Sequence, residues 1–188
     1  MHSLVARLVL LWSSAHTTPH FSFDARQAFP LTDRELLSQA RRKGFADGTT
    51  ALFLLFAGTD VDDLTLFTAH VGDCRAVLCR AGTAVRLTQD HRPDRRDEQK
   101  RIKEAGGGVF QVSGIWRCTS AAGAARALDA RAGFKDSDSH LYLSCSRTLG
   151  DPELKLNVDR PILSNIPEVP SGCFANHANW SHTFCFVL

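Results

Sequence analysis

The chain has 188 residues, enough for one domain with a sizeable hydrophobic core and short for two. Apolar residues make up 44% and charged residues 22%, values typical of globular proteins that argue against disorder throughout. The formal net charge is only +2, and even the densest basic stretch, Arg92–Lys103, alternates with acidic residues. This pattern is typical of a solvated helix surface, so we expect no nucleic-acid partner.

The segment Met1–Ala15 holds an apolar run, Leu8–Trp12, that is too short to span a bilayer, and we expect no membrane partner. We favour an N-terminal strand or helix edge there; a cleavable secretory signal preceded by Arg7 is the alternative. The six cysteines form no C-x-x-C pair. We therefore expect free thiols and a cytoplasmic or nuclear location.

The first predicted helix begins at Thr32. Thr32 and Glu35 form a capping-box pattern, cationic residues occupy the last turn, and Gly44 suits the C-terminal cap. Pro30 is expected to separate this helix from a weaker helical stretch at Ala25–Phe29.

Extended segments follow, and short turns between them favour an antiparallel sheet. The predicted strands are Ala51–Phe56, Leu64–Val71, Arg75–Cys79 and Thr83–Leu87, with an acidic turn at Asp60–Asp63 and a hairpin connection at Arg80–Gly82.

A second helix is predicted at Asp94–Ala105 and is stopped by Gly106–Gly108. Further predictions are a hairpin of Val109–Val112 and Ile115–Arg117, an inserted loop over Ser120–His140, and a strand at Leu141–Cys145. After Pro167 the periodicity is lost, and Phe174–Leu188 matches no pattern.

Several segments carry short motifs in a fixed order along the chain. They are G-T-T-A at 48–51, V-G-D-C-R-A-V-L at 71–78, L-T-Q-D-H-R-P at 87–93, E-x-x-R-I with A-G-G at 98–107, S-R-T-L-G-D with L-K at 146–155, and P-E-V at 167–169. Together they resemble the metal-dependent protein Ser/Thr phosphatases of type 2C.

The resemblance implies an α+β fold in which two antiparallel β-sheets pack as a sandwich with flanking helices, here as a partial domain over residues 24–169. Residues 1–23 then form an N-terminal segment of unassigned structure, residues 120–140 an insertion, and residues 170–188 a divergent tail. The residues expected to shape the scaffold are Gly48, Thr49, Thr50, Gly72, Arg75, Asp90, His91, Gly106, Gly107, Ser146, Arg147, Gly150 and Asp151.

The family hydrolyses phosphoserine and phosphothreonine in phosphoprotein substrates, using Mg or Mn ions held by carboxylates to activate water. Of its metal ligands only Asp73 has a counterpart here, because the chain has no M-E-D, no D-G-H and no D-G-x-W-D. Without partner carboxylates Asp73 is a turn residue. We therefore assign no catalytic residue and expect this chain alone to be inactive.

Three hypotheses remain at this point. The first is an incomplete type 2C phosphatase domain, inactive by itself. The second is a non-catalytic relative that binds phosphoproteins as a regulatory module. The third is a product that does not fold stably, because missing strands would leave unpaired sheet edges.

Overall fold

The computed structural model describes residues 19–57, 65–80, 82–128, 141–156, 160–170 and 184–187, with the backbone alone at 19–24, 57, 128 and 184–187. The predictions for the N-terminal segment before residue 19, the acidic turn at 60–63, the second half of the insertion (129–140) and the tail at 171–183 lie outside the described residues.

The longest element is helix α2, Pro19–Lys43, which runs through Pro30 without a break. The prediction that a helix starts at Thr32 is therefore wrong: the Thr32 hydroxyl lies inside the helix and donates to the Ala28 carbonyl, at 2.8 Å. Proline in a helix interior costs about 3 kcal/mol. Tertiary packing offsets this cost here, because Phe29 and Ala28 just before the proline are fully buried in the core.

The other end of α2 is as predicted. Cationic residues fill the last turn, and the amide of Gly44 donates to the Ala40 carbonyl at 2.8 Å. Gly44 has a φ of 70°, a left-handed conformation that favours glycine and ends the helix.

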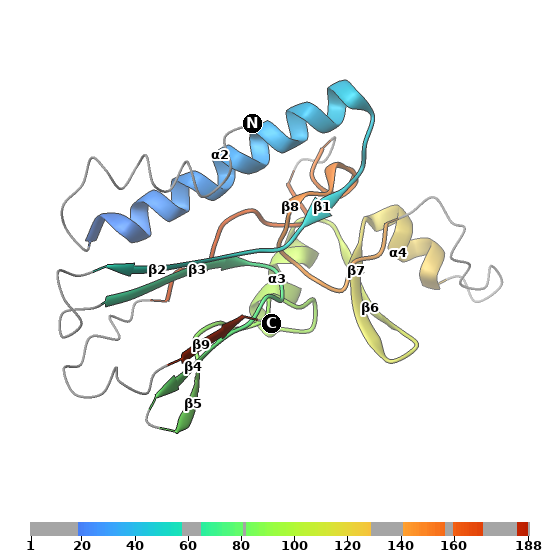
Figure 1. Ribbon diagram of the computed structural model, residues 1–188. Coiled ribbons are helices and arrows are strands. Elements are labelled where there is room, and N and C mark those ends of the chain that lie inside the picture. Colours follow the sequence, from blue (N-terminus) through green and yellow to red (C-terminus); the bar gives the residue numbers. More distant parts are fainter. Residues whose placement is uncertain are drawn as a thin grey trace.

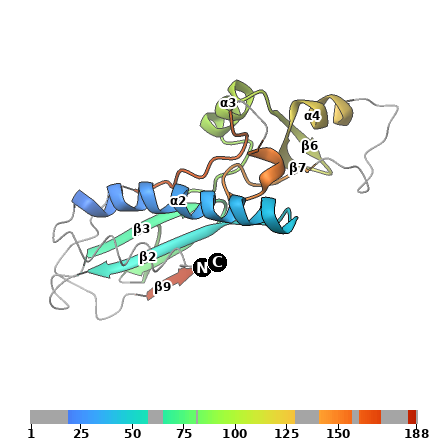
Figure 2. The same ribbon diagram turned by 90° about the horizontal axis from the view of Figure 1, so that it is seen from above.

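The β2–β3 hairpin, formed by Ala51–Ala57 and Thr65–Val71, lies along α2 (Figures 1 and 2). Its side chains alternate between two cores. Phe53, Leu55, Phe67, Ala69 and Val71 belong to the core with α2, and Leu52, Leu54 and Leu66 to a second core beneath the hairpin. Both faces are covered, which explains why β2 is apolar along its whole length.

The second core is closed by a three-stranded antiparallel sheet of order β5-β4-β9. Strands β4 (Ala76–Arg80) and β5 (Thr83–Arg86) form the predicted hairpin, and β9 (Phe184–Val187) pairs with the other edge of β4. The expected packing of two antiparallel sheets with a flanking helix is confirmed. Strand β9 was not expected, because the sequence after residue 170 matches no pattern. Its pairing with β4 shows that this tail supplies one strand of the sheet.

Another group of elements packs around a third core, which is formed by Ile102, Cys118, Leu154, Ile162 and Leu163. Its elements are α3 (Arg96–Glu104), the hairpin of β6 (Gly108–Val112) and β7 (Ile115–Thr119), α4 (Ala121–Leu128) and the 3₁₀ turn η2 (Pro152–Leu154). The short pair of β1 (Gly48–Thr49) and β8 (Leu149–Gly150) lies against α2, and Leu149 belongs to the first core.

Two predictions in this region are wrong. The first part of the expected loop at Ser120–His140 is helix α4, because its alanines form helix readily and Gly123 packs against the Thr119 side chain. The expected strand at Leu141–Cys145 is reduced to one bridge, between Leu143 and Cys118. None of the helices in the described part of the chain is long and apolar enough to cross a membrane.

A buried ion pair joins α2 to the β8 turn. Asp33 is 1% exposed, and its Oδ1 accepts from the amide of Gly150 at 2.7 Å and from Lys155 Nζ at 2.8 Å. Its Oδ2 accepts from Asn165 Nδ2 at 2.8 Å. Segments more than a hundred residues apart are thus held by one carboxylate.

Removal of this carboxylate is expected to be costly. Asp33→Ala leaves the buried Lys155 ammonium without its counter-charge, and we expect the free energy of unfolding to fall by about 3–5 kcal/mol. Arg26→Ala, on the exposed side of the same helix, is the matched control and should change it by less than about 0.5 kcal/mol. Urea unfolding measures both variants, and similar values for the two would refute a structural role for Asp33.

Candidate functional site

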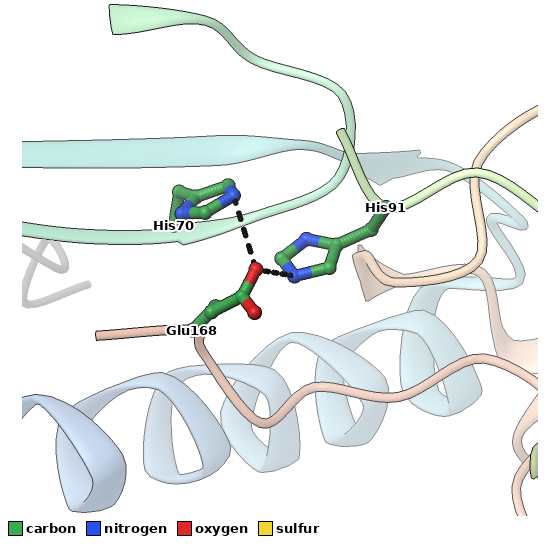
Figure 3. A group of neighbouring side chains, drawn as sticks. All are labelled: His70, His91 and Glu168. Carbon is green, nitrogen blue, oxygen red and sulfur yellow. Dashed lines mark ion pairs between the residues drawn. The ribbon is translucent and has the colours of Figure 1, made fainter. Parts of the chain in front are cut away.

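Two histidines and a glutamate meet between the β3 strand and the late segment around Pro167 (Figure 3). Glu168 Oε2 lies 3.2 Å from His91 Nε2 and 4.0 Å from His70 Nε2, and the two imidazole rings stack with centroids 4.5 Å apart. His70 and Glu168 also exchange both backbone hydrogen bonds, at 3.1 and 3.0 Å. A short bridge between distant segments therefore places the three side chains together.

The hydrogen bonds of the rings determine their tautomers. The amide of Gly72 donates to His91 Nδ1 at 3.0 Å, so this nitrogen carries no proton and His91 Nε2 does. His70 Nε2 lies 2.9 Å from the carbonyl oxygen of Gln89, which only accepts, so His70 Nε2 is also a donor. The remaining lone pair, on His70 Nδ1, is buried and has no partner among the described residues.

Both imidazoles are fully buried and electrically neutral near neutral pH. Burial lowers the pKa of His91 to about 3, helped by the nearby Arg147 guanidinium. Burial likewise lowers the pKa of His70, against the raising effect of its bond to Gln89. The charged partner of Glu168 is therefore Arg95, whose Nη1 donates to Oε2 at 3.1 Å, and not a histidinium.

Glu98 forms the centre of an adjoining buried network. Arg147 donates to its Oε1 from Nε at 3.0 Å and from Nη2 at 2.6 Å, and Arg101 Nη2 donates to its Oε2 at 2.8 Å. Burial would raise the pKa of Glu98, but these hydrogen bonds outweigh it and lower the pKa to about 2. Glu98 thus stays ionised down to strongly acidic pH.

The same arginines also hold distant backbone segments. Arg101 donates to the carbonyls of Ile162 and Ser146, and Arg147 to that of Ile166. The motif segments at 98–107, 146–155 and 167–169 therefore meet around one carboxylate. Such an arrangement is suited to fixing a scaffold, since its polar atoms are used by the chain itself.

The cluster does not fit the Mg or Mn ions expected from the resemblance. These hard cations take oxygen ligands, and the cluster offers one carboxylate, already bound by Arg95, with two imidazoles. Both Nε2 atoms carry protons, and the His91 Nδ1 lone pair is used by Gly72. The cluster is therefore unsuited to hold the catalytic metals of a type 2C phosphatase.

Asp73, the predicted metal ligand, lies exposed on the turn between β3 and β4. In the described part of the chain it does not join a group of three or more candidate ligands. Its charge adds to burial in raising the pKa of Cys145 to about 12, so that thiol is protonated. The four cysteines whose side chains are described are free thiols, as predicted.

The predicted scaffold residues lie at junctions between elements. Arg75 binds Asp90 through two parallel hydrogen bonds, Nε to Oδ1 at 3.0 Å and Nη2 to Oδ2 at 2.6 Å. The Arg75 bonds lower the pKa of Asp90, against the effect of partial burial. This pair clamps the β3–β4 turn to the segment that leads into α3.

The motif glycines allow close approaches at two other junctions. Gly48 pairs with Gly150 across β1 and β8, and a side chain at Gly48 would collide with the Asp151 carboxylate. Thr50 fills the space beside Gly72. The remaining members lie in β1 (Thr49), at the end of α3 (Gly106 and Gly107) and beside Arg147 (Ser146).

No sequence motif assigns a functional role to His70 or Arg95, and Glu168 lies in the P-E-V motif without an expected role. One signal pointed to His70: it shares the alternating positions of β3 with Leu66 and Thr68, which are buried. Its contacts with Gln89 and Glu168 depend on the three-dimensional fold.

Comparison with known proteins decides the family. Residues 13–179 match the family described as protein phosphatase 2C. The chain belongs to this family. It is 36% identical over 163 residues to the probable protein phosphatase 2C 74 of Oryza sativa subsp. japonica, and 38% identical over 130 residues to the probable protein phosphatase 2C 14 of Arabidopsis thaliana.

These matches cover 86% and 69% of this chain but only 34% and 22% of the two phosphatase 2C relatives. The chain thus spans about a third or less of their length. A solved serine-threonine phosphatase 2C from Toxoplasma gondii has a TM-score of 0.70 at 19% identity, covering 89% of this chain and 56% of that one. At this identity the likeness supports the shared fold alone.

Acid should weaken the fold through His91. Its pKa is about 3 when folded and near 6.5 when unfolded, so the unfolded chain binds the proton first as pH falls. Stability from the neutral ring is full above pH 6.5 and declines between pH 6.5 and 3, by about 2 kcal/mol at pH 5. Urea unfolding from pH 7.5 to 5 measures this decline.

The matched variant is His91→Asn, whose amide oxygen can still accept from Gly72 but does not titrate. Its stability should depend less steeply on pH than that of the parent chain. Equal slopes for the two proteins would contradict the role given to His91.

Proposed function

We propose that this chain forms the scaffold part of a phosphatase 2C domain and that alone it does not hydrolyse phosphoproteins. The observation that carries the proposal is the state of three of its buried carboxylates. Asp33, Asp90 and Glu98 are each neutralised by lysine or arginine side chains of the chain itself. A pair of Mg or Mn ions needs carboxylates whose charge is available to the metal.

The expected chemistry supports the same conclusion. Two bound cations would position and activate the water that attacks a phosphoserine or phosphothreonine ester. Of the family's ligand motifs, this chain matches only the one containing Asp73. A single exposed carboxylate binds such ions weakly, so phosphoprotein hydrolysis would need ligands that these residues do not supply.

A second candidate function is a non-catalytic module that binds phosphoproteins. The extensive network around Glu98 favours it, because the scaffold is retained and stabilised by contacts that require no metal. Both candidates imply phosphoprotein partners, and both fit the cytoplasmic or nuclear location that we propose from the free thiols.

The test is phosphate release from a phosphothreonine peptide by the purified chain with millimolar Mn. We expect no Mn-dependent turnover above the buffer rate, and no difference between the parent chain and Asp73→Asn. Mn-dependent turnover that disappears in Asp73→Asn, with the fold intact by its thermal melt, would overturn the proposal. A complete phosphatase 2C assayed in parallel serves as the positive control.

A further inference from the structure

The side of α2 that faces Leu156 and Asn165 forms one wall of a pocket of about 340 Å³. Arg34, Ser38 and Arg41 line it from the helix, and Leu156 and Asn165 line it from the two segments opposite. Positions 34, 38 and 41 are four and three residues apart, so they share one face of the helix. The pocket is distinct from the cluster of His70, His91 and Glu168.

The pocket carries positive charge that the described residues do not neutralise. Arg34 and Arg41 are exposed, and neither has an ion-pair partner in the parts of the chain that the structure describes. The acidic group of the pocket, Asp33, is already matched by Lys155, with its oxygens bonded to Gly150 and Asn165. An incoming anion would therefore meet two free guanidinium groups and no free carboxylate from Asp33.

The rest of the lining is apolar. Pro30 and Leu37 from α2 and Leu156 opposite are all partly exposed. Inorganic phosphate would not use such a surface, whereas a peptide could place an apolar side chain on it beside the anionic group. Guanidinium groups bind phosphate through paired hydrogen bonds, which makes arginine the usual residue for this recognition.

We propose that this pocket docks a phosphorylated peptide segment of a partner protein. The phosphate lies between Arg34 and Arg41, with the Ser38 hydroxyl as a further donor, and a neighbouring apolar side chain of the peptide packs on Leu37 and Leu156. The site requires neither a metal nor hydrolysis, so it goes beyond the proposed scaffold role and is independent of whether the chain is a phosphatase.

The test uses fluorescence anisotropy with a labelled phosphothreonine peptide that carries leucine beside the phosphate, in EDTA so that catalysis plays no part. Arg34→Glu with Arg41→Glu should weaken binding at least tenfold. The matched control is Arg26→Glu with Arg42→Glu, which makes the same charge change at exposed positions of α2 outside the pocket. This control should retain affinity to within about twofold, and circular dichroism confirms that both variants stay folded.

Two further measurements separate a peptide site from a simple anion site. Leu37→Ser should weaken binding of the leucine-containing phosphopeptide, and the unphosphorylated peptide should bind poorly. Equal losses in the two double variants, absence of phosphopeptide binding, or competition by inorganic phosphate at the same concentration as the phosphopeptide would each overturn the proposal.

Discussion

The structure depends on the neutralisation of one buried carboxylate. Glu98 is 1% exposed, and an isolated charge at such a position would be strongly unfavourable. Arg101, one turn further along α3, and Arg147, from a distant segment, therefore pair with it, and they hold the backbone near Ser146, Ile162 and Ile166 as they do so. Motif segments that are distant along the sequence are therefore in contact around Glu98. Arg95, near the same carboxylate, extends the network to Glu168 and the two histidines.

The parts of the fold that were predictable are those whose signals are local. The α3 helix ends at a run of glycines, and the β4–β5 and β6–β7 hairpins turn at Gly82 and Gly114. The parts that were not predictable depend on tertiary contacts. Helix α2 passes through Pro30 because its apolar face is buried, and β9 acquires its role only by pairing with β4. The periodicity of the sequence predicts only an antiparallel sheet, and the packing of two sheets as a sandwich is predicted by the resemblance to the family.

The candidate site was less predictable than the fold. The sequence draws attention to Asp73 because it lies in a motif, but its surroundings were unknown. The structure instead gathers His70, His91 and Glu168, and the protonation of the rings is determined by the backbone amide of Gly72 and the backbone carbonyl of Gln89. Backbone groups have no signature in a sequence, so the tautomers, and with them the mismatch with hard metal ions, are determined only by the three-dimensional structure.

The charged groups discussed above are of two kinds: buried carboxylates that the chain's own cations neutralise, and arginines beside a pocket that have no such partner among the described residues. Asp33, Asp90 and Glu98 are matched by the chain's own cations, which stabilises the scaffold and leaves these three carboxylates unavailable to Mg or Mn. In the pocket beside α2 the situation is reversed, because Arg34 and Arg41 line it and its acid, Asp33, is already paired. Unmatched charge is what an ionic ligand can use. By this criterion the described part of the chain is better suited to bind a phosphorylated partner through α2 than to hold the cations needed to hydrolyse the partner's phosphate ester.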